Sequence, residues 1–185
     1  MKLNMGCGNN KKLGYINVDA FPQCEPDVLF DLENFPWPWE DNSIDAVLFH
    51  QSLEHMGATT QAFLSLIKEL YRVCKNGTEI EIHVPHPRSD NFINDPTHVR
   101  IITPQLLQLF DKNLNDKWKL NGSSATPLAH YLGVDFRIKE YNLTLEEPYT
   151  TQYCTHKISI EELGTFIRER SNVASGFRIV MTAIK

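Results

Sequence analysis

Two glycines and two aspartates near the start of the chain have the residue types and spacing of a nucleoside-binding site. Gly6 and Gly8 follow a short apolar segment in LNMGCGNN, and without side chains they let backbone amides come close to a ligand. Asp19 ends the segment GYINVD, where a carboxylate can accept hydrogen bonds from both hydroxyls of a ribose. Asp31 follows the next apolar segment, in DLE. These residues predict a ligand site in the first third of the chain.

A second group of polar side chains lies in the segment HVPHPRSDNFINDPTHVRIITP. Its members with functional side chains are His83, His86, Arg88, Asp95, His98 and Arg100. Histidines and an aspartate can ligate a metal, but residues 83 and 86 of one strand point to opposite faces, unlike a helical HExxH pair. We therefore predict no metal site. A neutral imidazole can take a proton from a substrate hydroxyl, so His86, Asp95 and His98 are our candidate catalytic residues.

These residues need strands and helices to position them. Apolar runs rich in β-branched and aromatic residues predict strands at 2–5, 15–18, 28–32, 44–49, 80–84 and 177–184, and one further strand within 134–145. Apolar residues at helical spacing predict a helix from Thr59 or Thr60 to Asn76 and Gly77. Glu54 and His55, between the fourth strand and this helix, are expected to cap or buttress a turn.

Two further helices have start signals. Thr103 and Pro104 supply an N-cap and a first helical residue for a helix through Leu114. Ser159 and Glu162 form a capping-box pattern for the last helix. Strands that alternate with helices predict an α/β fold, namely a Rossmann-like, doubly wound, mostly parallel sheet with helices on both faces. We expect one domain over residues 1–185, with the cofactor half at about 1–77 and substrate-side loops at about 85–103 and 116–156.

The motifs LNMGCG, GYINVD, DLE and the strand that ends in LEH, taken in this order, resemble the small class I S-adenosylmethionine-dependent methyltransferases of the methyltransferase type 11-like family. The resemblance spans about residues 2–110, and DPTHVR resembles the same proteins. It implies S-adenosyl-L-methionine as the cofactor and the following cofactor-binding residues: Gly6, Cys7 and Gly8 beside the methionine moiety, Asp19 at the ribose, Asp31 and Leu32 at the adenine, and His50 and Gln51 below the methyl group.

Two positions depart from that family's pattern. Asn4 stands where the family has an acidic residue before the glycine loop. Only five residues separate Gly8 from Gly14, although a parallel crossover usually contains a helix. We therefore expect an unusually short first crossover.

The expected reaction is methyl transfer to an oxygen or nitrogen of an acceptor. An NPPY tetrapeptide, typical of enzymes that methylate adenine or amide nitrogens, is absent, since Phe49, His50, Gln51 and Ser52 stand in its place. A pocket with His, Asp and Asn suits a hydroxylated molecule, so we expect a small or carbohydrate-like acceptor. One alternative is a methyltransferase-like protein that binds cofactor or a protein partner without turnover, which Asn4 suggests. The other is an NAD-binding oxidoreductase, which lacks support because Lys11 stands where a GxGxxG fingerprint needs glycine.

Composition excludes several other classes of function. The formal net charge of −5 and the scattered Lys and Arg residues argue against nucleic acid as the main partner. No apolar run is long enough for a membrane span, and the chain begins directly with a strand-like segment rather than a signal sequence, so we expect a soluble cytoplasmic protein. The four cysteines form no CxxC pair and are expected to be free thiols. The sequence carries no signature of a particular oligomeric state.

Overall fold

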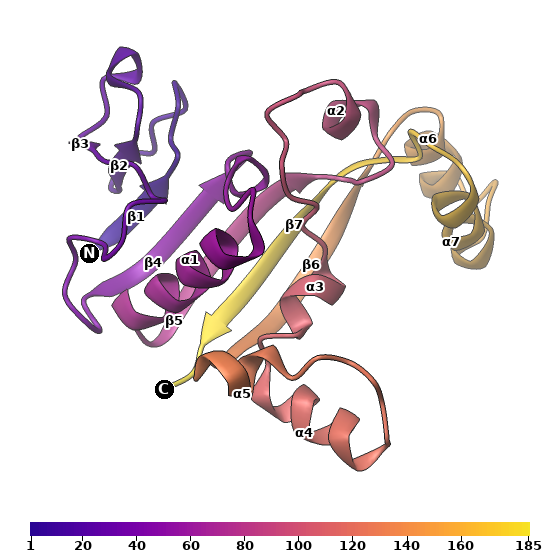
Figure 1. The fold of residues 1–185 in the computed structure, drawn as a ribbon. Helices are drawn as coiled ribbons and strands as arrows, with labels where there is room; N and C mark the ends of the chain where they lie inside the picture. Colours follow the sequence, from indigo (N-terminus) through magenta and orange to yellow (C-terminus); the bar gives the residue numbers. More distant parts are fainter.

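One seven-stranded sheet organises the protein (Figure 1). The computed structural model describes residues 1–185. The strands are β1 (Lys2–Met5), β2 (Ile16–Asp19), β3 (Val28–Leu29), β4 (Ile44–His50), β5 (Cys74–Pro85), β6 (Phe136–Leu145) and β7 (Ala174–Ala183), in the spatial order β3-β2-β1-β4-β5-β7-β6. All neighbours pair in parallel except β7, which is antiparallel to both β5 and β6. The predicted mostly parallel, Rossmann-like sheet is confirmed.

The helices lie mainly between the later strands. They are α1 (Thr60–Val73), α2 (Asp90–Ile93), α3 (Pro104–Gln108), α4 (Lys112–Leu120), α5 (Leu128–Leu132), α6 (Tyr149–Cys154) and α7 (Ile160–Glu169), with short 3-10 turns η1 (Pro22–Cys24) and η2 (Leu53–His55). Thr59, Thr103 and Ser159 cap α1, α3 and α7 with their side chains, and Ser159 with Glu162 forms the predicted capping box. No helix has the length and apolar character needed to cross a membrane.

The predicted ends of two helices are wrong. Helix α1 ends at Val73 and not at Asn76 and Gly77, because the carbonyls of Arg72 and Val73 accept hydrogen bonds from Asn42 and Ser43 and the chain turns directly into β5. The predicted helix from Pro104 to Leu114 is divided into α3 and α4. Asp111 starts the second of these, since its carboxylate accepts the backbone amide of Leu114 at 3.0 Å.

The hydrophobic core lies between α1 and the middle of the sheet. In Figure 1, α1 runs along β4 and β5. The apolar face of α1 consists of Phe63, Leu66, Ile67, Leu70 and Val73, all buried, and packs in one cluster with strand residues such as Ile80 and Ile82. Each such side chain contributes roughly 1.5 to 3 kcal/mol when it leaves water. This packing fixes β4, whose carboxyl end leads into the candidate site.

The sheet packs an apolar face against α1, and the opposite face of β5 and β7 carries polar side chains. Along β5, Ile80, Ile82 and Val84 are fully buried in the core, whereas Glu81 between them pairs with Arg178 of β7 at 2.7 Å. No helix occurs in the crossovers from β1 to β2, β2 to β3 or β3 to β4 apart from η1.

Asn4 organises the short first crossover, residues 6–15. Its side-chain amide donates to the carbonyl oxygen of Asn10 at 3.0 Å and to Asn17 Oδ1 at 2.9 Å, and Asn4 is only 1% exposed. Asn17 in turn donates to Asp27 Oδ2 at 2.8 Å. This network of side chains pins the loop to β1 and β2, so the two strands pair in parallel without a helix between them. The expected short crossover is confirmed.

Candidate functional site

A cavity of about 630 Å³ opens where the order of the strands reverses, beyond the carboxyl ends of β1, β2 and β4. Ligands of open α/β sheets bind at this kind of position. The lining residues are Gly6, Gly8, Asp19, Ala20, Phe21, Phe30, Asp31, Leu32, Glu33, Gln51, Ser52, His55, Met56 and Thr97. Six of the eight residues expected to bind the cofactor are therefore brought together at one surface.

The glycine loop after β1 packs closely on the loop after β4. Gly6 has a φ of +65°, and a Cβ there would lie 2.7 Å from Ser52 Cβ. The Ser52 hydroxyl donates to the carbonyl of Met5 at 2.7 Å, which joins the two loops. Only glycine fits at position 6 without displacing Ser52, so this residue shapes the floor of the cavity.

Asp19 holds the other side of the glycine loop. Its Oδ2 accepts the backbone amide of Gly8 at 2.7 Å, and its Oδ1 accepts the amide of Phe21 at 2.9 Å. Each carboxylate oxygen can accept two hydrogen bonds, so Asp19 retains lone pairs for the hydroxyls of a ligand in the cavity.

The far end of the cavity combines a carboxylate with aromatic side chains. Asp31 Oδ1 accepts the backbone amide of Glu33 at 2.9 Å, which orders the turn after β3. Phe30 packs edge-on against Trp39, and Phe21 is 67% exposed although it is a large apolar side chain. An exposed aromatic side chain at a cavity offers a flat apolar surface for an adenine ring.

Cys7 and His50, the remaining two expected cofactor ligands, do not line the cavity. Cys7 is 4% exposed beneath the loop, and burial raises the pKa of its thiol. His50 Nδ1 lies 3.1 Å from Asn10 Nδ2, and its ring is 5.1 Å from the ring of His83 on the polar face of the sheet. Gln51 does line the cavity, because its φ of +53° turns the chain after β4.

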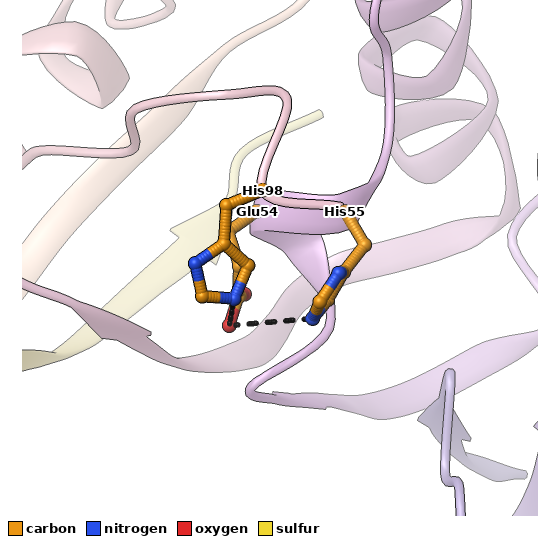
Figure 2. Close-up of side chains that lie close together, drawn as sticks. All are labelled: Glu54, His55 and His98. Atoms are coloured by element: carbon orange, nitrogen blue, oxygen red, sulfur yellow. Dashed lines mark ion pairs between the residues drawn. The ribbon is translucent and has the colours of Figure 1, made fainter. Parts of the chain in front are cut away.

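Glu54, His55 and His98 form a compact cluster (Figure 2), and His55 also lines the cavity. His55 Nε2 and His98 Nε2 lie 4.0 and 3.9 Å from Glu54 Oε1, which is longer than a hydrogen bond. Glu54 is 1% exposed, and neither of its carboxylate oxygens has a hydrogen-bond partner. Burial raises the pKa of the Glu54 carboxyl to about 7. Glu54 and His55 come from η2, and His98 comes from the loop after α2.

The Nδ1 atoms of His55 and His98, which point away from Glu54, are held by hydrogen bonds. His98 Nδ1 lies 2.9 Å from the carbonyl oxygen of Phe92, and His55 Nδ1 lies 2.9 Å from Thr97 Oγ1. The Thr97 hydroxyl donates to Asp95 Oδ1 at 2.6 Å. These contacts fix the orientation of both rings and direct their Nε2 atoms toward Glu54.

Comparison with known proteins agrees with this fold. Residues 17–82 match the family model described as a methyltransferase domain. A SAM-dependent methyltransferase from Archaeoglobus fulgidus superposes with a TM-score of 0.63 at 20% identity, over 98% of this chain and 85% of that chain. The chain has the class I methyltransferase fold. No curated protein sequence matches it.

Two further solved structures share this methyltransferase fold. A SAM-dependent methyltransferase from Thermotoga maritima, described as a possible histamine N-methyltransferase, has a TM-score of 0.54 at 14% identity, over 100% of this chain and 81% of that chain. The [4+2]-cyclase SpnF has a TM-score of 0.53 at 15% identity, over 99% of this chain and 74% of that chain. The fold therefore accompanies more than one named activity, and the acceptor has to be argued from the site.

The three candidate catalytic residues lie in different surroundings. His98 belongs to the cluster, and Asp95 supports Thr97, which lines the cavity. His86 lies apart from both. Its ring packs 5.1 Å from Phe177, its Nδ1 accepts the backbone amide of Arg88 at 3.2 Å, and burial lowers its pKa.

A second, smaller hollow of about 360 Å³ meets this cavity at Gln51. Its lining is Gln51, His83, Val84, Pro85, Asn91, Thr144, Ser175, Gly176 and Phe177. Asn91, Thr144 and Ser175 were not predicted from the sequence, because they come from three distant segments: α2, β6 and β7. Phe21 and Phe30 were not predicted either, although apolar residues beside strand-end aspartates were a usable signal.

Proposed function

We propose that this protein transfers a methyl group from S-adenosyl-L-methionine to an oxygen or nitrogen of a small, hydroxylated acceptor such as a carbohydrate-like molecule. The observation that carries the proposal is the continuous cavity from Gly6 and Asp19 to His55, with the polar hollow beyond Gln51. S-adenosylmethionine is the cofactor of the class I methyltransferases whose fold this chain has. The lining fits it, since carboxylates, glycine amides and aromatic faces match a nucleoside that carries an amino acid.

Each part of the cavity has a distinct role in this proposal. Asp19 holds the ribose hydroxyls while its contact with Gly8 keeps the loop closed under the ligand. Asp31, Leu32 and the nearby aromatic rings hold the adenine. When bound, the cofactor supplies an electrophilic methyl group on a sulfonium, and the carbon–sulfur bond breaks with its electron pair left on sulfur as the acceptor bonds to carbon.

The remaining residues align the acceptor. Gln51, His55 and Thr97 line the end of the cavity where the acceptor atom meets the methyl group, and the proton that this atom loses leaves at the same end. Asn91, Thr144 and Ser175 offer hydrogen-bonding groups to the rest of a hydroxylated molecule in the hollow. Alignment and exclusion of water are the main contributions that a protein makes to a reaction of this kind.

The polar hollow favours a hydroxylated acceptor over an extended nucleic acid, in agreement with the net charge of −5. The NAD-binding alternative needs a helix whose N-terminus meets a pyrophosphate, and residues 6–15 contain no helix. Binding of cofactor or of a protein partner without turnover remains a distinct alternative, since the fold also occurs in a protein named a cyclase.

Calorimetry with S-adenosylhomocysteine and with NAD tests the cofactor part of the proposal. We expect S-adenosylhomocysteine to bind and NAD to bind at least tenfold more weakly. A screen of hydroxylated small molecules, read out as S-adenosylhomocysteine release, tests turnover. Tighter binding of NAD would contradict the proposal, whereas cofactor binding with no product from any acceptor class would support the binding-only alternative.

A further inference from the structure

Glu54 presents a buried charge that the protein does not balance by a hydrogen bond. Its side chain is 1% exposed, and both carboxylate oxygens lack a partner. No lysine or arginine forms an ion pair with it; its ion-pair contacts are with the two histidines, and the Asp95 carboxylate adds like-charge repulsion. A buried carboxylate without a partner costs free energy. Such a group is therefore normally protonated, paired with another side chain or bound to a cation.

The hydrogen bonds around His55 and His98 decide which ring nitrogens are free. A carbonyl oxygen only accepts, so His98 Nδ1 must carry the hydrogen in its 2.9 Å contact with Phe92. The hydroxyl hydrogen of Thr97 is used in its 2.6 Å bond to Asp95, so His55 Nδ1 must donate to Thr97 Oγ1. In the neutral rings both Nε2 atoms therefore present a lone pair.

These two lone pairs and the Glu54 carboxylate converge on one point. The ligand atoms of the three residues all lie within 4.8 Å of one another, and Asp95 Oδ2 lies a further 3.8 Å from His98 Nε2. With Glu54 ionised and both rings neutral, no hydrogen lies between the three groups, and this arrangement is repulsive as it stands. A cation at the centre would turn the same three groups into ligands.

We propose that Glu54, His55 and His98 bind a divalent first-row transition metal such as Zn²⁺ or Fe²⁺. Two imidazoles and one carboxylate are a ligand set that both metals take in proteins while they keep open positions. Tetrahedral ligands about 2.0 to 2.1 Å from a metal lie about 3.3 Å apart. The Glu54–histidine separations of 4.0 and 3.9 Å would therefore close by roughly 0.6 to 0.7 Å, and the widest separation, which is within 4.8 Å, by at most about 1.5 Å. The outer hydrogen bonds to Phe92 and Thr97 are the kind that orient metal-bound histidines.

The place of this metal site defines its role, and this part of the inference rests on the proposed function. His55 and Thr97 line the acceptor end of the cavity, so the open coordination positions are next to the reacting atoms. A metal there would hold an acceptor hydroxyl by its oxygen and would lower the pKa of that hydroxyl; its proton would leave from the same end of the cavity to bulk solvent, since both Nε2 lone pairs would be used. The acceptor class is thereby narrowed to molecules with a metal-binding hydroxyl.

Other histidine–carboxylate contacts in the chain lack this arrangement and provide a control. His130 Nε2 lies 2.8 Å from Asp116 Oδ1, which is a direct hydrogen bond, and no third ligand accompanies it. His130→Ala should therefore leave metal binding unchanged.

The test is metal content and cobalt spectroscopy, neither of which needs an acceptor. The protein, purified without a histidine tag, is freed of metal with a chelator and titrated with Co²⁺ and Zn²⁺. We expect about one ion per chain and visible absorption bands from Co²⁺ in a site with nitrogen ligands. His98→Ala and Glu54→Gln should weaken binding at least tenfold, and His130→Ala should not.

Two results would overturn the metal site: no binding by the wild-type chain at micromolar metal, or the same affinity in His98→Ala, Glu54→Gln and wild type. If circular dichroism shows that either variant is unfolded, His55→Ala is used in its place, because His55 is the most exposed of the three side chains. Binding of S-adenosylhomocysteine is measured on the same samples. Cofactor binding without metal binding refutes only this inference, and metal binding without cofactor binding refutes the proposed function.

Discussion

The backbone amide of Gly8 donates a 2.7 Å hydrogen bond to Asp19 Oδ2, which links the loop after β1 to the end of β2. The two residues belong to strands that pair in parallel across a crossover without a helix. In this protein the contact holds the glycine loop against β2, whereas in dinucleotide-binding folds the glycine loop leads into a helix whose N-terminus meets the pyrophosphate. The same carboxylate is thus both a structural acceptor and the proposed ribose ligand.

Asp19→Ala should weaken binding of S-adenosylhomocysteine by about 1.5 to 3 kcal/mol, the range for lost hydrogen bonds to a charged acceptor. The affinity is measured by calorimetry, with circular dichroism as a check on folding. Asp116→Ala serves as the control, because Asp116 pairs with His130 away from the cavity and should not change the affinity. Unchanged affinity in a folded Asp19→Ala protein would remove Asp19 from the site.

Gly6→Ala should destabilise the protein and weaken cofactor binding together. The added Cβ would lie 2.7 Å from Ser52 Cβ and would adopt a φ of +65°, a combination that costs on the order of 1 to 3 kcal/mol. Gly77→Ala is the matched control, since Gly77 has a φ of +83° with no atom near its Cβ position. Urea unfolding of both variants isolates the clash, and equal stability losses would show that Ser52 yields freely.

Asn4→Asp should destabilise the protein, by roughly 2 kcal/mol or more, although it restores the acidic residue seen in similar proteins. The buried amide of Asn4 donates to Asn10 and Asn17, and a carboxylate can make neither bond. Denaturant unfolding gives the loss of stability, and calorimetry gives the cofactor affinity. A stable variant with tighter cofactor binding would show that Asn4 is a weakened cofactor ligand rather than the anchor of the crossover.

His98→Ala should leave S-adenosylhomocysteine affinity within about twofold of wild type, because His98 lies in the cluster and not on the cavity surface. Once an acceptor is found, transfer per folded molecule should fall by roughly 100-fold or more, the contribution of a positioned proton acceptor or metal ligand. The two quantities come from calorimetry and single-turnover assays. A lower melting temperature with normal turnover would mean that His98 only packs the loop.

Local sequence determined much of the fold and part of the site. Thr59 and Ser159 cap their helices as predicted because capping depends on residues only a few positions apart. Gly6, Gly8 and Asp19 come to one cavity because parallel strands carry their carboxyl ends to the same edge of a sheet.

Tertiary structure decided what depends on contacts between distant segments. The turn after β4 directs Gln51 into the cavity and His50 away from it, a choice made by a backbone conformation that no spacing reveals. From the sequence, Glu54 and His55 were predicted only to cap or buttress a turn. In the structure, the loop that carries His98 packs against them, and the Glu54 carboxylate is buried beside the two imidazoles. The first three crossovers likewise contain no α-helix, and on the polar face of the sheet Arg178 pairs with Glu81 across strands far apart in the chain.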